Sequence, residues 1–351
     1  MIIAMPAAGQ DANLQAKAEL ERLQQSLKEK PISYPGVPNA NAMVSDSLKA
    51  ALQASSAGRL YMSLEDLCRA TDALRGMWTA ADQADAVKTG LPAYEVEWER
   101  VSLNLAATHR QVREQDWTDA RAAIRGLAET ADGRTGSLLD GGRGFAVSLE
   151  PKEGLIFLGQ AQGEAEFAAF AASLHLPRKG TPYPLRSLLP ELESLQQKTN
   201  AAFQPPRSID LHARFMVLNS ALKLAKELDA SKFYAGALYQ YLEAVSAYGM
   251  LDALPLDASQ QSALKETLVA MRHKLDASQR DDSIARLFLE RAESQVAHLD
   301  GSAPSSDDWR SAKVIVDQVV AAYFAADQPL ALHGRAPGKT VDVTLVRWPY
   351  T

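Results

Sequence analysis

The residue types that most often carry catalysis or bind metals occur in this chain at spacings that favour neither. The six histidines are His109, His175, His212, His273, His298 and His333. Because no two of them lie three to five residues apart, no helix would present two imidazoles to one metal ion. The sequence also lacks Gly-x-Ser-x-Gly, the turn that exposes a nucleophilic serine in many hydrolases. We therefore expect no catalytic residue, no metal site and no cofactor, and the prediction leans away from an enzyme.

Cys68 is the only cysteine, which excludes an intramolecular disulfide and every metal site built from several cysteines. Because it follows Leu64 and Leu67 on the expected apolar face of a helix, we interpret it as a core thiol. Two acidic groups occupy polar helix or capping contexts, and we interpret both as solvated faces, not acid–base dyads. They are Glu95, Glu97 and Glu99, and the pair Asp281 and Asp282.

Residues 233–248 carry the pattern most suggestive of binding. Tyr234, Leu238, Tyr241, Val245 and Tyr248 fall at i, i+4, i+7, i+11 and i+14, the spacing of one helix face. Buried tyrosines need partners for their hydroxyl groups, so tyrosines concentrate at interfaces and ligand grooves. The face is therefore either a core stripe whose hydroxyls reach the rim, or a groove for a peptide, an aromatic ligand or a sugar. Tyr239 points away from this face and should be exposed, so the candidate partner-binding residues are Tyr234, Tyr239, Tyr241 and Tyr248.

Three segments share an aromatic–small–bulky–small spacing. They are Asp116-Trp117-x-x-Ala120-x-x-x-Ile124-x-x-Leu127, Tyr234-x-x-Ala237-x-x-x-Tyr241-x-x-Ala244 and Asp308-Trp309-x-x-Ala312-x-x-x-Val316-x-x-Val319. Leu60, Ser63, Leu67 and Ala70 form a looser fourth copy. The spacing resembles the second helix of a tetratricopeptide repeat, but without the regular period of a tandem array. The resemblance implies stacked helical hairpins, a concave surface for a protein or peptide, and no catalytic residues.

Apolar periodicity and the placement of proline predict an all-α fold of antiparallel helical hairpins, partly α-solenoid-like. The helices expected in the first half are 11–30, 46–54, 57–76, a segment after Pro92, 116–130 and 163–174. Those expected in the second half are 190–203, 209–228, 231–250, 258–275, 280–299 and 307–325. Asp116 is the expected N-cap of the helix that runs to Thr130.

One region predicts β structure instead. Residues 132–144 are rich in glycine, which predicts a flexible loop. The expected order here is helix, loop, strand, whereas a phosphate-binding loop follows a strand and precedes a helix. Residues 145–149 and 155–158 flank a turn that contains Pro and Gly, which predicts a β-hairpin (145–158). Because an isolated hairpin is marginal in water, we expect 340–348 to complete a small three-stranded element.

Composition and proline placement divide the chain into five segments. They are 1–30, an N-terminal segment with a polar helix; 31–176, a helical region with the β-hairpin insertion; 177–206, a Pro-rich linker and helix; 207–328, a helical-hairpin region; and 329–351, a C-terminal strand or tail. Ala7-Ala8-Gly9 carries the small residues of a signal-peptidase site, although no basic stretch precedes it. Residues 1–9 are either the end of a signal peptide or a cytosolic terminus. We expect a periplasmic or secreted protein, with a cytoplasmic one as the alternative.

The 351 residues carry a formal net charge of −6, so no basic excess predicts binding to nucleic acid or to an anionic membrane. No run of apolar residues is long enough to predict an integral membrane span. We therefore predict a non-enzymatic helical scaffold that presents a helical-hairpin surface to a protein or peptide partner. The alternatives are a small-molecule-binding or hydrolytic protein, with its site between the helices and the β element, and a structural component of a larger assembly.

Overall fold

The computed structural model describes residues 8–33, 39–174, 176–203, 211–297 and 303–328, and each structural statement below concerns these ranges. Within them the fold is all-α, with helices packed largely antiparallel, which confirms the predicted class. Extended segments pair only at two isolated bridges, Ala120 with Pro177 and Thr181 with Arg280, and no β-strand forms in these ranges.

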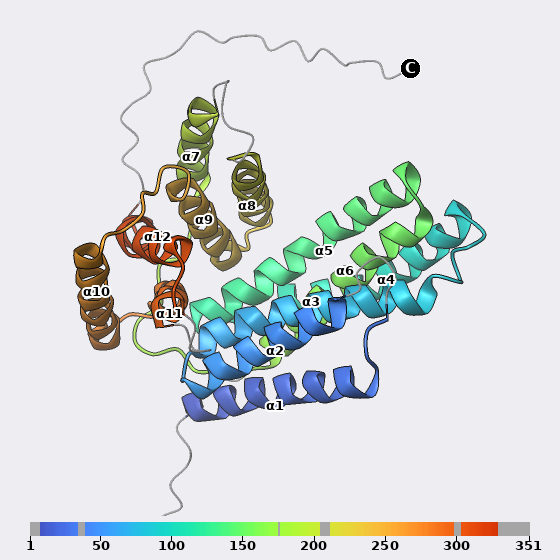
Figure 1. Cartoon of the computed structure of the whole chain (residues 1–351), viewed down its shortest axis with the longest axis horizontal. Coiled ribbons are helices and arrows are strands. Elements are labelled where there is room, and N and C mark those ends of the chain that lie inside the picture. Colours follow the sequence, from blue (N-terminus) through green and yellow to red (C-terminus); the bar gives the residue numbers. More distant parts are fainter. Residues whose placement is uncertain (1–7, 34–38, 175, 204–210, 298–302, 329–351) are drawn as a thin grey trace, which may run out of the picture.

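Six long helices build the first half of the chain. They are α1 (Ala8–Glu29), α2 (Ala40–Ser56), α3 (Leu60–Gln83), α4 (Leu91–Glu114), α5 (Ala122–Ser148) and α6 (Pro151–Ser173). The apolar face predicted around Leu64, Leu67 and Leu74 is buried on α3. α6 packs against α3, α4 and α5, and these helices run side by side in Figure 1.

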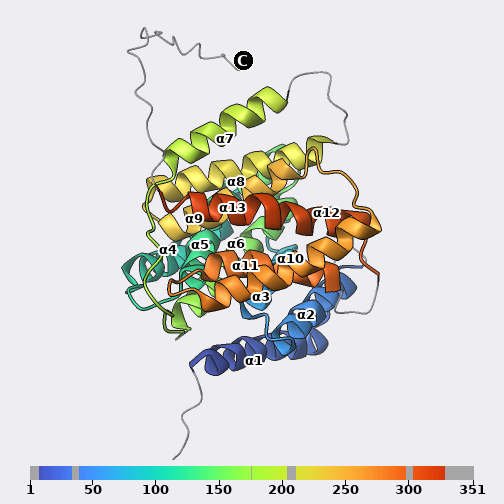
Figure 2. The ribbon, with the colours of Figure 1, turned by 90° about the vertical axis from the view of Figure 1, so that its left-hand side faces the viewer.

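The second half is a layer of shorter helices beside one end of this bundle (Figures 1 and 2). They are α7 (Leu189–Ala202), α8 (His212–Ala230), α9 (Tyr234–Gly249), α10 (Ala258–Ala277), α11 (Ser283–Ala297), α12 (Ser306–Val314) and α13 (Val320–Ala325). A π-helical turn, η2 (Ile315–Val319), joins α12 and α13 into one continuous helix. α9 packs on α5 and α8, and α11 on α3 and α5, so one apolar cluster extends from α1 to Ala326.

The glycine-rich segment 132–144 is helical, and the predicted loop there is wrong: these residues lie inside α5. Its glycines allow close packing between helices. A Cβ atom on Gly142 would lie 3.0 Å from the carbonyl oxygen of Gly154 on α6, and one on Gly133 would lie 2.7 Å from Leu228 on α8. Glycine lowers helix propensity, but Gly142 and Gly133 permit close contacts of α5 with α6 and α8.

The predicted β-hairpin at 145–158 is also wrong. α5 continues to Ser148, and α6 begins at Pro151, two residues beyond Leu149. Proline suits the first turn of a helix because its missing N–H would have no intrahelical partner there. Glu150-Pro151 therefore begins a helix instead of forming a hairpin turn. The third predicted strand, 340–348, lies outside the described residues.

Helix boundaries in the second half agree with the predicted ones to within a few residues. The N-cap prediction at Asp116 is wrong, because Asp116 accepts a hydrogen bond from the backbone N–H of Thr118 in a turn and α5 begins only at Ala122. None of the described helices combines the length and the apolar composition needed to cross a bilayer.

Candidate binding groove

The packing of α9 decides which of its faces is open for binding. Its small residues face α5: a Cβ atom on Gly236 would lie 2.9 Å from the Cβ atom of Glu129, and the Gly236 N–H donates to Glu129 Oε2 at 2.8 Å. This close contact leaves the side that carries Tyr241 and Tyr248 toward α7 and the η2–α13 helix. In Figure 2, α7 lies at the edge of the molecule opposite α1.

A cavity of about 310 Å³ lies between α7, α9 and the η2–α13 helix, and we name it the α7–α9 groove. Its apolar lining comes from Leu195, Val245 and Ala322, and its polar lining includes Glu191, Lys198 and Gln318. Tyr241 and Tyr248 line it from α9. Gln318 belongs to the π-helical turn, a local irregularity that is frequent at functional sites.

The hydroxyl groups of Tyr241 and Tyr248 are free for a ligand. Neither makes a hydrogen bond to any described residue, and both side chains are partly exposed. Two more deeply buried tyrosines have partners: Tyr183 donates to the carbonyl oxygen of Tyr323, and Tyr323 donates to Asp282. The groove therefore offers two phenol groups that can both donate and accept.

Glu191, on the first turn of α7, is the acidic residue of the groove lining. One of its carboxylate oxygens accepts a hydrogen bond from Arg186, while Oε2 is buried and has no partner among the described residues. Burial raises the pKa of Tyr241, and the nearby Glu191 charge raises it further. Glu191 therefore places a negative charge beside the groove, while its Oε2 atom is shielded from solvent and from a ligand in the groove.

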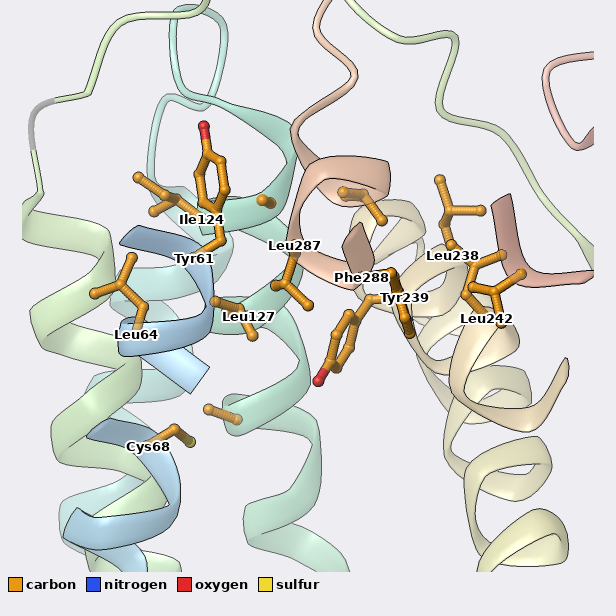
Figure 3. Packing of buried hydrophobic residues seen from close by; sticks show 14 of the residues in the cluster. Tyr61, Leu64, Cys68, Ile124, Leu127, Leu238, Tyr239, Leu242, Leu287 and Phe288 are labelled. Atoms are coloured by element: carbon orange, nitrogen blue, oxygen red, sulfur yellow. The ribbon is translucent and has the colours of Figure 1, made fainter. Parts of the chain in front are cut away.

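The four tyrosines singled out in the sequence do not act as one site. Tyr241 and Tyr248 line the groove, whereas Tyr234 borders a separate crevice beside Arg186. The expectation that Tyr239 is exposed is wrong: only 3% of it is accessible. Figure 3 shows its ring in the packed layer between α9 and Phe288 of α11, because α3 and α11 cover this side of α9.

Tyr239 belongs to a buried ionic network instead of a contact surface. Its hydroxyl donates to Glu65 Oε1 at 3.0 Å, and Arg291 donates to the same oxygen at 2.6 Å and to Glu243. Burial alone would raise the pKa of Glu65, but Arg291 and Arg69 outweigh it and hold that pKa at about 2. The network therefore joins α3, α9 and α11.

Cys68 is buried, as expected. Its thiol donates to Glu164 Oε2 at 3.2 Å, and burial followed by the Glu164 charge raises the thiol pKa well above its usual value. Because the thiolate is the reactive form of cysteine, this environment disfavours nucleophilic chemistry.

The acidic groups differ in their surroundings. Glu95, Glu97 and Glu99 remain accessible to solvent. The prediction of a solvated face at Asp281 and Asp282 is wrong, since only 4% and 7% of these residues are accessible. Asp281 accepts from the N–H groups of Ala122 and Ser283, so it caps the starts of two helices that are far apart in the sequence.

Sequence reasoning missed two features. His109 Nδ1 lies 2.6 Å from Asp132 Oδ2 across α4 and α5, the kind of contact that orients an imidazole in hydrolases. No serine, threonine or cysteine in the described ranges donates to this imidazole. The second missed feature is Glu191 in the groove. The sequence indicated only that a helix begins at Leu189-Pro190-Glu191, and not what this side chain would contact. No set of three or more potential metal ligands converges in the part of the chain that the structure describes.

Comparison with protein-family models, curated proteins and solved structures finds no match to this chain.

Proposed function

We propose that this chain is a non-enzymatic binding protein whose α7–α9 groove takes a segment of a polypeptide partner. The observation that carries the proposal is the pair of hydroxyls on Tyr241 and Tyr248 that have no hydrogen-bond partner among the described residues, in a groove that Glu191 also lines. The predicted tyrosine face of residues 234–248 supports it in part, because two of its three tyrosines line this groove.

The dimensions and chemistry of the groove favour a polypeptide. A volume of about 310 Å³ is at the lower end for pockets that enclose a whole small molecule. It suits one or two anchor side chains, the way in which protein interfaces concentrate their binding energy. Leu195, Val245 and Ala322 would contact an apolar anchor, and backbone N–H groups of the partner would donate to the hydroxyl oxygens of Tyr241 and Tyr248.

The test selects peptides from a random library displayed on phage, using the full chain as bait, and measures synthetic copies by calorimetry. Ala322→Phe places a large side chain in the groove, whereas Ala321→Phe makes the same change at an exposed neighbouring position that does not line it. We expect the first variant to weaken peptide binding at least tenfold, about 1.4 kcal/mol, and the second to leave binding unchanged.

A second pair of variants tests the hydroxyl groups. Tyr241→Phe combined with Tyr248→Phe should weaken binding severalfold without lowering the melting temperature. Tyr94→Phe is the matched control, because the Tyr94 hydroxyl is also unpartnered but lies in the apolar cluster of α4, α5 and α6. Selected peptides that bind Ala322→Phe as tightly as the unchanged chain would contradict the proposal, and so would a library that yields no specific peptide.

A further inference from the structure

A second cavity, of about 340 Å³, lies where the starts of three helices meet. Its lining includes Leu60 and Tyr61 at the start of α3, Arg121 just before α5, and Ser283 at the start of α11. Lys179, from the segment before α7, completes the rim. Figure 1 shows the starts of α3 and α5 close to α11, so this junction cavity brings together segments from both halves of the chain.

The acidic side chains of the junction cavity are already engaged. Asp281 accepts from backbone N–H groups of α5 and α11, and Glu290 accepts from the N–H groups of Tyr61 and Met62 at 3.0 and 3.1 Å. Asp282 accepts from Arg280, Ser278 and Tyr323, and Asp276 from Arg286. These carboxylates therefore accept hydrogen bonds from the N–H groups at the helix starts and neutralise the charges of Arg280 and Arg286.

Two cations of the cavity lack a carboxylate partner among the described residues. Arg121 donates to the carbonyl oxygen of Pro177 at 3.1 Å and to the hydroxyl of Tyr61 at 2.6 Å, both of them neutral acceptors. Lys179 donates only to the backbone oxygen of Asp276, at 3.3 Å. Within the described ranges neither residue forms an ion pair, although both line the same cavity.

Tyr61 adds a directed donor. Only 4% of the residue is accessible, its hydroxyl accepts from Arg121, and its own O–H hydrogen has no acceptor in the described ranges. In Figure 3 this hydroxyl points away from Leu64 and Leu127. A buried O–H without an acceptor is unfavourable, so the cavity favours a ligand that supplies an acceptor oxygen.

The charges of the cavity point to the same ligand chemistry. The four acidic side chains are matched by four basic ones, Arg121, Lys179, Arg280 and Arg286. The starts of α3, α5 and α11 each add a partial positive charge of about half a unit. The balance is therefore positive, and the positive charge that no carboxylate neutralises is concentrated at Arg121 and Lys179.

We propose that the junction cavity binds a small ligand through an oxyanion, a carboxylate or a phosphate, held by Arg121, Lys179 and the Tyr61 hydroxyl. The cavity exceeds the volume of a bare oxyanion, and Leu60 and Leu275 give it an apolar wall for a short carbon skeleton. Binding would link α3 and α5 to the segment before α7, and it is independent of the α7–α9 groove.

The test titrates the full chain separately with sodium phosphate and sodium succinate, at an ionic strength held constant with sodium chloride, by calorimetry and thermal unfolding. Because phosphate stabilises many folded proteins without binding, the decisive comparison is between variants. Lys179→Ala should weaken binding roughly tenfold, the loss expected for one hydrogen bond between charged groups. Lys223→Ala, which removes an exposed lysine of α8, is the matched control and should bind like the unchanged chain.

Tyr61→Phe is the second variant, and it should weaken binding while Lys179 remains in place. The salt that binds more tightly identifies the oxyanion as a phosphate or a carboxylate. Equal binding by the unchanged chain, Lys179→Ala and Tyr61→Phe would overturn the proposal, and so would the absence of binding heat with both salts.

Discussion

Glu290 illustrates how one buried carboxyl group connects distant parts of this chain. From α11 it accepts the N–H groups of Tyr61 and Met62 at the start of α3. Burial is the largest influence and raises its pKa to about 7, against the opposing effect of those N–H donors and of Arg286. The group therefore stays protonated in the folded chain at pH values where an unfolded chain would have released the proton.

The raised pKa of Glu290 predicts a pH dependence of stability. Between the unfolded pKa of 4.5 and the folded value of about 7, the folded state binds more protons than the unfolded state. The stability from this group is therefore complete below pH 4.5 and is lost as the pH rises through 7. We expect Glu290→Gln to remove roughly 3 kcal/mol or slightly more of this pH dependence, measured by urea unfolding across that pH range.

The pKa of Asp72 is raised in the same way, to about 7, by burial and then by the Glu164 charge. The stability of Glu290→Gln should therefore still fall to some extent as the pH rises. Glu266→Gln, at an exposed position of α10, serves as the control and should retain the full slope. A slope in Glu290→Gln identical to that of the unchanged chain would contradict this account of the carboxyl group.

At the scale of the helix, α5 and α6 show that a glycine can either weaken an element or permit its packing. A Cβ atom on Gly136 of α5 would meet nothing within 4 Å, whereas one on Gly159 of α6 would lie 2.3 Å from the carbonyl oxygen of Arg75 on α3. The first glycine costs helix propensity with no contact in return, and the second allows the backbones of α3 and α6 to approach.

These positions predict opposite effects of the same substitution. Gly136→Ala should stabilise the chain by about 0.5–1 kcal/mol, because alanine favours the helix. Gly159→Ala should destabilise the chain by about 1–3 kcal/mol or more, because overpacking a close helix contact usually has an effect of that size. Urea unfolding at one pH measures both, and a gain in stability from Gly159→Ala would show that α3 and α6 are not in such close contact.

At the scale of the whole molecule, the two halves share one apolar cluster and several buried polar contacts. α11 packs on α3 and α5, and Arg291 of α11 bonds to Glu65 of α3. Separating the halves would leave these charges and apolar surfaces exposed, which is unfavourable. The shared core predicts that both halves unfold in one transition.

Cys68 provides a reporter for that prediction, because it is the only thiol and is buried in α3. We expect its reaction with a thiol reagent to begin at the same urea concentration at which circular dichroism detects loss of helix. Coincident transitions are the signature of two-state unfolding. Labelling of Cys68 at clearly lower urea, while most helix remains, would instead show that the first half opens by itself.

Local pattern alone determined much of this protein: the all-α class, the approximate ends of α7 to α11 and of the continuous α12–α13 helix, and the buried face of α3. Apolar periodicity and proline placement act over one or two turns, so they can be read without knowledge of the neighbours. The same logic placed Tyr241 and Tyr248 on one face of α9, where the structure also has them.

Only the tertiary structure decided what surrounds each face. Within the helical segment 132–144, Gly142 packs closely on α6 and Gly133 on α8, and Tyr239 is buried because α3 and α11 cover that side of α9. The groove at Glu191 and the cations Arg121 and Lys179 at the junction cavity likewise assemble from segments far apart in the chain. Such contacts depend on which helices meet in space, and no local spacing encodes that.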